Sequence, residues 1–269
     1  EMTSSLVGSE MCIRDRAKEF TVEAGRPDSI TKEKLRILRA AEVTRISINP
    51  QTMKQETLDR IGRKHTVKQI KDVFYEARKQ GFDNINMDLI VGLPGEDEVD
   101  FVNTLLQIGK MEPDSVTVHT LVIKRASRMR REQLESGADM RAEDLLIPYM
   151  QDSSGEYFEE QGFEPYYMYR QKNKSGTTRN TNQENVAYAK PGKECLYNML
   201  IMEELETIVA LGSGASTKIV YPGENRMERV ENVKNVDEYI NRIDEMIERK
   251  RSGFRELLQK CCLLYTSDA

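Results

Sequence analysis

Apolar and polar residues alternate along residues 84–91, and this pattern predicts a buried strand that ends at a Gly-Leu-Pro-Gly turn. Ile85, Met87 and Leu89 fall on one face of the strand, because successive side chains of a strand point to opposite faces. Asp88 falls on the other face, near the end of the strand. A buried carboxylate is costly unless it is bound to something, and parallel α/β proteins place ligands at the C-terminal ends of their strands. Asp88 is therefore a candidate ligand contact.

Strand-like and helix-like patterns alternate through the first half of the chain. The expected strands are residues 20–25, 44–49, 84–91 and 115–122, and the expected helices are residues 32–41, 54–61, a helix between Thr66 and Gly81, and one that includes Val102 and Ile108. Four strand–helix units in succession predict a parallel sheet with right-handed crossovers. A closed barrel, an open barrel and a flat doubly wound sheet all remain open. The flat nucleotide-binding sheet is disfavoured, because no GxGxxG or GxxxxGKS loop is present.

The pattern changes near Met150, where we place a domain boundary. After this point we expect a helix at 155–161, an aromatic-rich strand at 163–170, a buried strand at 208–215 that turns through two glycines, and an amphipathic helix at 236–249. Residues 17–150 would then form the strand–helix domain, and residues 151–260 would form a mixed α+β C-terminal region.

The two ends of the chain differ from the body. Residues 6–15 (LVGSEMCIRD) resemble a translated tagmentation adapter of the kind used in DNA sequencing, and residues 262–269 (CLLYTSDA) resemble the same kind of adapter read on its opposite strand. We therefore exclude residues 1–16 and 261–269 from the fold as foreign sequence, and we expect the native protein to be truncated at both ends. An ordinary tail at each end is the alternative.

The composition argues against two classes of protein. The chain of 269 residues carries a net charge of −5 with 32% charged residues, whereas affinity for nucleic-acid phosphates needs basic patches. No stretch approaches the roughly 18 apolar residues of a membrane-spanning helix. We therefore expect no nucleic-acid partner and no insertion into a membrane.

Cysteine and histidine offer no metal site by their spacing. Once the two ends are set aside, Cys195 is the one native cysteine, and one cysteine makes neither a disulfide framework nor a metal site. His65 and His119 are the only histidines, and they lie too far apart in the sequence to predict a metal site. We expect His119 to be a hydrogen-bonded core residue of a strand and Cys195 to be a small buried residue.

Polar residues stand at one predicted edge of the sheet. Glu23, Gln51 and Asp88 lie at or near the C-terminal ends of three strands, and Arg63 follows the end of a helix. Such a set suits a zwitterionic ligand that also bears hydroxyl groups, because carboxylates accept hydrogen bonds from hydroxyls or an ammonium and arginine binds a carboxylate in bidentate fashion. In the structural alternative, Arg63 pairs with a nearby acidic residue and Gln51 caps a turn.

Several motifs resemble the radical S-adenosylmethionine (radical SAM) coproporphyrinogen dehydrogenase family, whose members are oxygen-independent coproporphyrinogen III oxidase-like proteins. The first three motifs are residues 44–52 (TRISINPQT), 61–66 (IGRKHT) and 84–96 (NINMDLIVGLPGE). Two more, residues 188–198 (YAKPGKECLYN) and 211–215 (LGSGA), resemble the HemZ branch of that family. The resemblance covers about residues 18–258, and it is specific because the motifs keep the order and spacing of the family.

The resemblance implies an α/β fold, namely an open, TIM-like (β/α)6 barrel with a C-terminal extension over its mouth, of which this chain would hold the last four units. Glu23 matches the family glutamate that contacts the ribose or amino group of S-adenosylmethionine. Gln51, Arg63 and Asp88 match further contacts with that cofactor. The backbone near Val122 matches its adenine contact. Glu23, Gln51, Arg63 and Asp88 are also the polar residues at the predicted edge of the sheet, and we call this edge the rim.

The activity of the family follows from the same resemblance. The family converts two propionate side chains of coproporphyrinogen III to vinyl groups by radical decarboxylation in haem biosynthesis. The complete protein is thus expected to be a cytoplasmic, monomeric oxidoreductase with S-adenosylmethionine and a [4Fe-4S] cluster as cofactors. Its partners would be a porphyrinogen substrate and an electron donor. A haem-binding chaperone or carrier of the same family is the alternative.

Two departures from the family pattern bear on activity. The three cluster cysteines of the family, spaced CxxxCxxC, precede all of these units, and this chain contains no such motif, so we expect it to be inactive by itself. Haem-chaperone relatives carry His-Asn-x-x-Tyr-Trp where this chain has residues 184–188 (ENVAY). The missing histidine and tryptophan disfavour the chaperone alternative.

Overall fold

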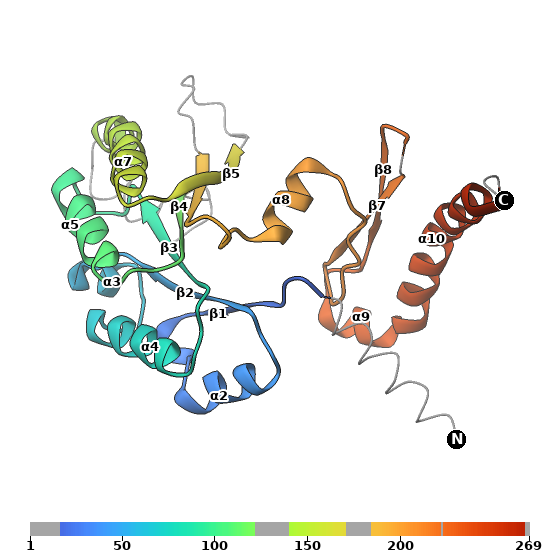
Figure 1. Cartoon of the computed structure of the whole chain (residues 1–269), viewed down its shortest axis with the longest axis horizontal. Helices are drawn as coiled ribbons and strands as arrows, with labels where there is room; N and C mark the ends of the chain where they lie inside the picture. The colour runs from blue at the N-terminus through green and yellow to red at the C-terminus, as the bar shows by residue number, and fades with distance from the viewer. Residues whose placement is uncertain (1–16, 122–139, 171–183, 222, 267–269) are drawn as a thin grey trace. The chain divides into compact units, whose positions relative to one another are not determined.

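The computed structural model describes residues 17–121, 140–170, 184–221 and 223–266, which belong to two compact units (Figure 1). The first unit ends at Cys195 and the second begins at Leu196. The boundary expected near Met150 lies inside the helix α7 (Met140–Glu160), so the units divide later in the chain than the pattern suggested. The cause is that the strands after α7 complete the sheet of the first unit.

A six-stranded sheet in the order β1-β2-β3-β4-β6-β5 forms the centre of the first unit. Its strands are β1 (Thr21–Gly25), β2 (Arg45–Gln51), β3 (Ile85–Val91), β4 (Ser115–Thr120), β5 (Glu164–Arg170) and β6 (Glu184–Ala189). The first four strands are parallel, while β6 pairs antiparallel with both β4 and β5. The four expected strands and the parallel sheet are confirmed, and the sheet is open, with β1 and β5 at its edges.

The connections between the parallel strands are helical. They are the short helix η1 (Pro27–Ser29) with α2 (Lys32–Ala40), then α3 (Gln55–Arg60) with α4 (Val67–Lys79), then α5 (Glu98–Gly109). Thr31 caps α2, and Thr66 caps α4 in a capping box with Gln69, because their hydroxyls accept the backbone N–H groups that a helix start leaves unpaired. Gly62 and Gly81, which follow α3 and α4, both adopt a positive φ.

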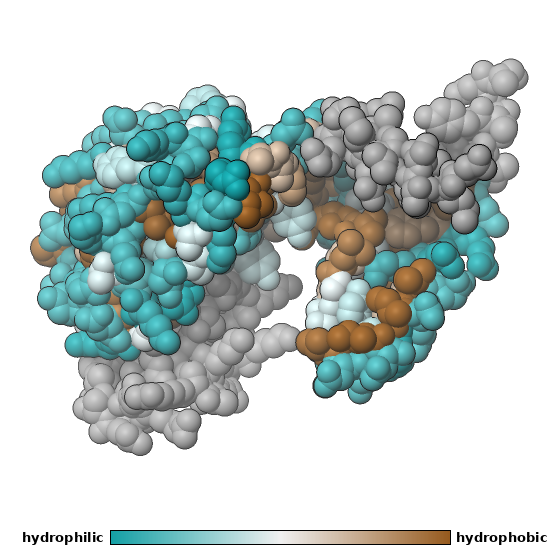
Figure 2. Space-filling model, turned by 90° about the horizontal axis from the view of Figure 1, so that it is seen from below, coloured by the Kyte–Doolittle hydropathy of each residue, from teal (hydrophilic) through white to brown (hydrophobic). Residues whose placement is uncertain are grey.

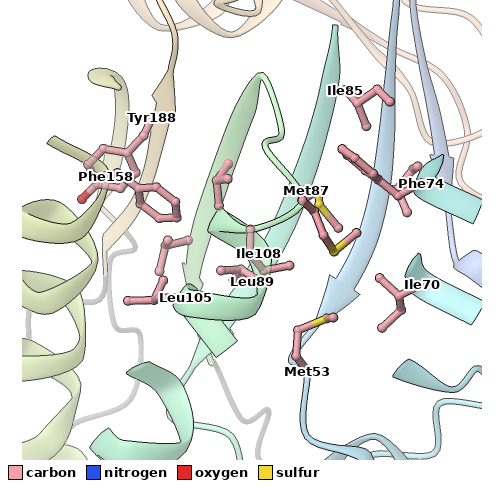
Figure 3. Packing of buried hydrophobic residues seen from close by; sticks show 14 of the residues in the cluster. Met53, Ile70, Phe74, Ile85, Met87, Leu89, Leu105, Ile108, Phe158 and Tyr188 are labelled. Carbon is pink, nitrogen blue, oxygen red and sulfur yellow. The ribbon is translucent and has the colours of Figure 1, made fainter. Parts of the chain in front are cut away.

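The hydrophobic core lies between the sheet and these helices (Figure 3). Ile85, Met87 and Leu89 of β3 are fully buried there against Phe74 of α4 and Ile108 of α5, as the alternation predicted. Each such side chain contributes about 1.5–3 kcal/mol when it is fully buried. The register of β3 is therefore strongly specified, because a slip by one residue would move these side chains to the opposite face.

In its described residues, the second unit contains a β-hairpin and three helices. Its elements are α8 (Leu196–Glu203), β7 (Ser216–Tyr221), β8 (Arg226–Glu231), α9 (Val236–Asn241) and α10 (Ile243–Thr266). The expected buried strand at 208–215 is wrong: Ile208 forms one isolated bridge with Lys218, and Leu211 is 79% exposed. Gly212 and Gly214 both have positive φ and turn the backbone. The Ala210 N–H donates its hydrogen bond to the Thr217 hydroxyl.

The single helix expected at 236–249 is also wrong. The chain leaves helical geometry at Arg242, which has φ −115° and ψ 29°, so that α9 and α10 are separate helices. The guanidinium of Arg242 binds Glu238 on α9 and Glu245 on α10. No glycine or proline marks this break, and the apolar periodicity continues through it. The helix expected at 155–161 is the last part of the much longer α7.

Apolar side chains gather on the surface of the second unit (Figure 2). They include Leu205, Val209, Leu211, Val236 and Ile240, all of which are exposed. Exposed apolar groups in this number are typical of a surface that contacts another surface. Within the described residues, no helix has the length and apolar character needed to cross a bilayer.

Candidate functional site

The face of the sheet opposite the helices is polar. Because strand side chains alternate, this face receives Arg45 and Ser47 from β2, Asn86 and Asp88 from β3, and Ser115, Thr117 and His119 from β4. Glu23 of β1 joins them, since the Ser47 hydroxyl donates a hydrogen bond of 2.5 Å to its carboxylate. We call these eight residues the polar face.

A chain of hydrogen bonds runs across the polar face toward Asp88. The Arg45 guanidinium donates to Ser115 Oγ at 3.1 Å, and the hydroxyls of Ser115 and Thr117 each donate to Asn86 Oδ1 at 3.1 Å. With its oxygen held by two donors, Asn86 donates through Nδ2 to Asp88 Oδ1 at 2.7 Å. The orientation of Asp88 is therefore set by groups on two neighbouring strands.

Asp88 is the acceptor at the end of this network. Its side chain is 15% exposed, so a ligand can reach it although most of it is out of water. His119 Nε2 lies 3.8 Å from Asp88 Oδ1. His119 is thus half-buried beside a carboxylate at the polar face, whereas the sequence led us to expect a core residue.

Gln51 ends β2 in an unusual conformation. Its φ is +72°, in the left-handed region that residues other than glycine rarely adopt, and its side chain is buried at 6% exposure. The pairing of β2 with β3 is regular to Ile48 and resumes at Gln51 opposite Leu89, which places a bulge between them. Strained backbone of this kind gathers at functional sites, so the structure gives Gln51 a second reason to be a candidate.

Arg63 is half-buried in the loop between α3 and α4. Burial lowers the pKa of its guanidinium, and the positive charge of Arg26 lowers that pKa further. Within the described residues Arg63 makes no ion pair, and neither Arg63 nor Gln51 makes a side-chain hydrogen bond. The structural alternative, in which Arg63 pairs with an acidic residue and Gln51 caps a turn, has no support there. The negative charge of Asp28 raises that pKa in part, but a half-buried guanidinium that makes no ion pair within the described residues is suited to bind an anionic group of a ligand.

The remaining expected site positions have different outcomes. Val122 lies outside the described residues, as does the N-terminal segment 1–16. Cys195 is buried as expected, and its thiol donates to Glu19 Oε1 at 3.4 Å. Among the described residues no group of three histidine, cysteine or acidic side chains could hold a metal ion. These residues therefore do not fit a [4Fe-4S] cluster.

Sequence reasoning missed the network that supports Asp88. Arg45, Ser47, Asn86, Ser115 and Thr117 are all buried polar residues on strands. The signal was present, because each of them alternates with apolar residues of the helix-packed face. What the sequence could not show is which strands are neighbours, and therefore that Asn86 meets Ser115 and Thr117.

Glu96, which follows the Gly-Leu-Pro-Gly turn, is another buried acid near the rim. The Thr52 hydroxyl donates to its carboxylate at 2.6 Å. Burial raises the pKa of this carboxyl above its ordinary value of 4.5, and the hydrogen bonds from Thr52 and Thr57 offset only part of that rise. Glu96 joins the loop after β2 to the loop after β3 through this contact, but its ionised form is held in an unfavourable environment.

We expect Glu96→Gln to raise the melting temperature of the first unit by a few degrees at pH 8. The folded-state pKa lies above the unfolded-state value, so the parent carries a desolvated carboxylate at pH 8 and loses that cost as the pH falls through the folded pKa. The advantage of the variant should therefore disappear near pH 4. Glu56→Gln on the exposed side of α3 is the control and should change neither melting curve. A variant that melts below the parent at pH 8 would contradict this expectation.

Comparison with known proteins places this geometry in a family. The sequence profile of the radical SAM superfamily matches residues 9–108, a range that carries β1, β2, β3 and the helices between them. The chain contains a radical SAM domain. The match begins inside the N-terminal segment that we expect to be foreign, and the origin of that segment stays a prediction.

Two curated relatives of the radical SAM domain carry different names. The oxygen-independent coproporphyrinogen-III oxidase-like protein HemZ of Bacillus subtilis (strain 168) is 42% identical over 243 residues, which are 90% of this chain and 47% of that protein. The heme chaperone HemW of the same organism is 37% identical over 106 residues, which are 39% of this chain and 28% of that protein. The chain spans less than half the length of each of these relatives. The resemblance to this family is confirmed.

A solved structure confirms the fold of the radical SAM domain. Coproporphyrinogen III oxidase (HemN) from Escherichia coli, described as a radical SAM enzyme, matches with a TM-score of 0.63 over 84% of this chain and 49% of that chain. The sequence identity is 18%, so the likeness is one of fold. The open, mostly parallel α/β architecture expected from the sequence is therefore confirmed.

Proposed function

We propose that the polar face and its rim form the S-adenosylmethionine site of a radical SAM oxidoreductase. The observation that carries this proposal is the buried hydrogen-bond network that orients Asp88 at the rim where Gln51 ends β2. Such a network is costly in a sheet unless the carboxylate it supports has a partner. The radical SAM superfamily match over the same strands supports the choice of cofactor.

The residues at the rim match the chemistry of that cofactor. S-adenosylmethionine presents ribose hydroxyls, an ammonium and a carboxylate, and in this family it supplies the 5′-deoxyadenosyl group that becomes the hydrogen-abstracting radical. Asp88 and Glu23 would accept hydrogen bonds from the hydroxyls or the ammonium. Arg63 would bind the carboxylate in bidentate fashion. Gln51, held in its left-handed conformation, would make a further contact, and the backbone near Val122 would receive the adenine.

We further propose that the whole protein acts on coproporphyrinogen III. It would convert two propionate side chains to vinyl groups with loss of carbon dioxide. An electron donor would start each cycle, the deoxyadenosyl radical would take one hydrogen atom from the propionate, and the electron left after loss of carbon dioxide would pass to an electron acceptor. The name of the relative that is 42% identical supports this substrate. A cytoplasmic location, a monomeric state of the complete protein and a [4Fe-4S] cluster whose cysteine ligands this chain does not supply belong to the same proposal.

A haem carrier is the second candidate, because several relatives are named heme chaperones. In the chaperone motif this chain keeps Asn185 and Tyr188 but has Glu184 in place of histidine. Tyr188 is buried at 6% exposure and packs against Phe158 on the helix side of the sheet, with ring centroids 5.3 Å apart. A tyrosine in that position serves the core, so the structure supports the oxidoreductase more than the carrier.

A chimera tests the proposal. Residues 17–258 would replace the matching part of the Bacillus subtilis HemZ relative, and the product would be incubated anaerobically with S-adenosylmethionine, a reductant and coproporphyrinogen III. We expect formation of 5′-deoxyadenosine and of vinyl-bearing porphyrinogen, and the loss of both in the chimera that carries Asp88→Asn. Tight haemin binding without decarboxylation would instead favour the carrier. An inactive chimera beside an active parent relative would refute the proposed function.

A further inference from the structure

His65 is a fully buried polar residue beside the rim that the proposed cofactor contacts do not use. It lies two residues after Arg63, and its side chain has 0% exposure. Its Nε2 is 3.4 Å from the carbonyl oxygen of Pro50, at the end of β2. Its Nδ1 is 3.7 Å from Asp28 Oδ1, in the turn that follows β1. The ring therefore lies beside the end of β2 and the turn that follows β1.

The imidazole of His65 stands between two oxygen acceptors but carries one proton. Burial lowers the pKa of His65 below its ordinary value of 6.5, and the Pro50 carbonyl and the Asp28 carboxylate offset only part of that fall, so the ring is neutral near pH 7. A neutral ring has one N–H and can donate to one acceptor. With the Nε2 proton donated to Pro50, the buried Nδ1 has no hydrogen-bond partner among the described residues. A polar ring left half-satisfied in a core is unfavourable, which points to a role beyond filling space.

The group that His65 holds is the backbone next to Gln51. The carbonyl of Pro50 belongs to the peptide that leads into Gln51, whose φ is +72°. The bulge in β2 also lies here, between Ile48 and Gln51. A non-glycine residue stays in the left-handed region only when its surroundings fix it there. His65 can help to fix this conformation through its hydrogen bond to the Pro50 carbonyl.

We propose that His65 is a positioning residue for the rim. Its hydrogen bond to Pro50 joins the Arg63 loop to the end of β2 and holds the left-handed conformation of Gln51. The inference rests on the proposed function, because the geometry of Gln51 and Arg63 matters for binding only if they contact S-adenosylmethionine.

Two variants separate this role from simple packing. His65→Phe keeps an aromatic ring but removes the donor to Pro50, and His65→Gln keeps a donor of similar reach. Phe74→Leu is the control, because it shortens a fully buried core residue of the same unit without touching the rim. For each chain, hydrogen–deuterium exchange would be measured along the first unit, and S-adenosylmethionine affinity would be measured by equilibrium dialysis.

We expect His65→Phe to speed amide exchange in residues 49–53 and 61–66 about tenfold relative to the rest of the unit, the size expected for one lost hydrogen bond. Cofactor affinity should fall about tenfold as well. His65→Gln should restore most of both losses. Phe74→Leu should raise exchange across the unit without the local excess and should leave affinity unchanged.

Amide exchange and cofactor affinity test different parts of this proposal. If His65→Phe raises exchange no more at residues 49–53 and 61–66 than elsewhere, or if His65→Gln rescues nothing, the positioning role is wrong, whatever the affinity does. A local effect on exchange with unchanged affinity overturns it too, because the rim geometry would not matter for binding. If the parent chain does not bind S-adenosylmethionine, the proposed function fails, while exchange still decides whether His65 holds the bulge.

Discussion

Replacing Asp88 with asparagine should weaken S-adenosylmethionine binding by about 1.5–3 kcal/mol, which is roughly 10- to 150-fold. The substitution keeps the shape of the side chain and removes its charge. Asn86 Nδ2 already donates to Oδ1, so an amide nitrogen placed there would face another donor, and an amide elsewhere would accept a ligand hydroxyl less strongly. Equilibrium dialysis of this chain with labelled S-adenosylmethionine measures the effect.

The matched control is Asp72→Asn, the same chemical change on the exposed outer side of α4, where Asp72 pairs with Lys68. It should leave affinity unchanged, because surface pairs of this kind contribute little. Arg63→Lys should weaken binding like Asp88→Asn, since a point charge does not reproduce a bidentate guanidinium. If Asp88→Asn and Arg63→Lys bind the cofactor as the parent does while melting at lower temperature, both residues are structural and the cofactor assignment fails.

Anaerobic reconstitution of this chain with iron and sulfide should yield no [4Fe-4S] protein. The cluster needs closely spaced thiolates, and the four cysteines of the sequence stand at 12, 195, 261 and 262, with no CxxxCxxC spacing. Cys195 is buried against Glu19 in the first unit. Iron and sulfide content together with the electron paramagnetic resonance spectrum after reduction would measure cluster formation, and Escherichia coli HemN treated in parallel is the positive control.

A cluster present in stoichiometric amount and lost in Cys195→Ser would contradict this prediction. It would show that Cys195 acts together with the terminal cysteines, and the interpretation of both ends as foreign sequence would then be wrong. Loosely bound iron that gel filtration removes would agree with the prediction.

Local signals predicted the first unit well, because they coincide with its tertiary structure. Ile85, Met87 and Leu89 of β3 are buried as the alternation predicted, and the expected helix starts are capped by Thr31 and Thr66. In these places the requirements of the core, the helix ends and the turns agree. Sequence pattern is most informative where several levels of structure demand the same residue.

In the second unit, local sequence patterns gave wrong predictions at two places. Apolar residues at 208–215 predict a buried strand, yet Leu211 is exposed, since the neighbouring glycines turn the chain away from a partner strand. The helix breaks at Arg242, whose guanidinium binds Glu238 and Glu245, and no glycine or proline marks this position. The two units divide later than the boundary placed near Met150, because β6 returns to pair with β4, a long-range contact that composition does not record.

The candidate site also contains some residues that the sequence could reveal and others that it could not. Glu23, Gln51 and Asp88 could be selected from strand ends, because a parallel sheet brings such ends to one edge. Their roles toward a cofactor stay predictions. The groups that support them, such as Asn86 and His65, could not be selected, because their importance comes from neighbours far away in the sequence.

The two faces of β3 determine which substitutions this strand can accept. Residues 85, 87 and 89 pack against the helices, while residues 86 and 88 lie on the polar face, so neighbouring positions of β3 meet different structural requirements. A substitution at the partly exposed Asp88 can therefore change the polar face while Ile85, Met87 and Leu89 keep their packing against the helices.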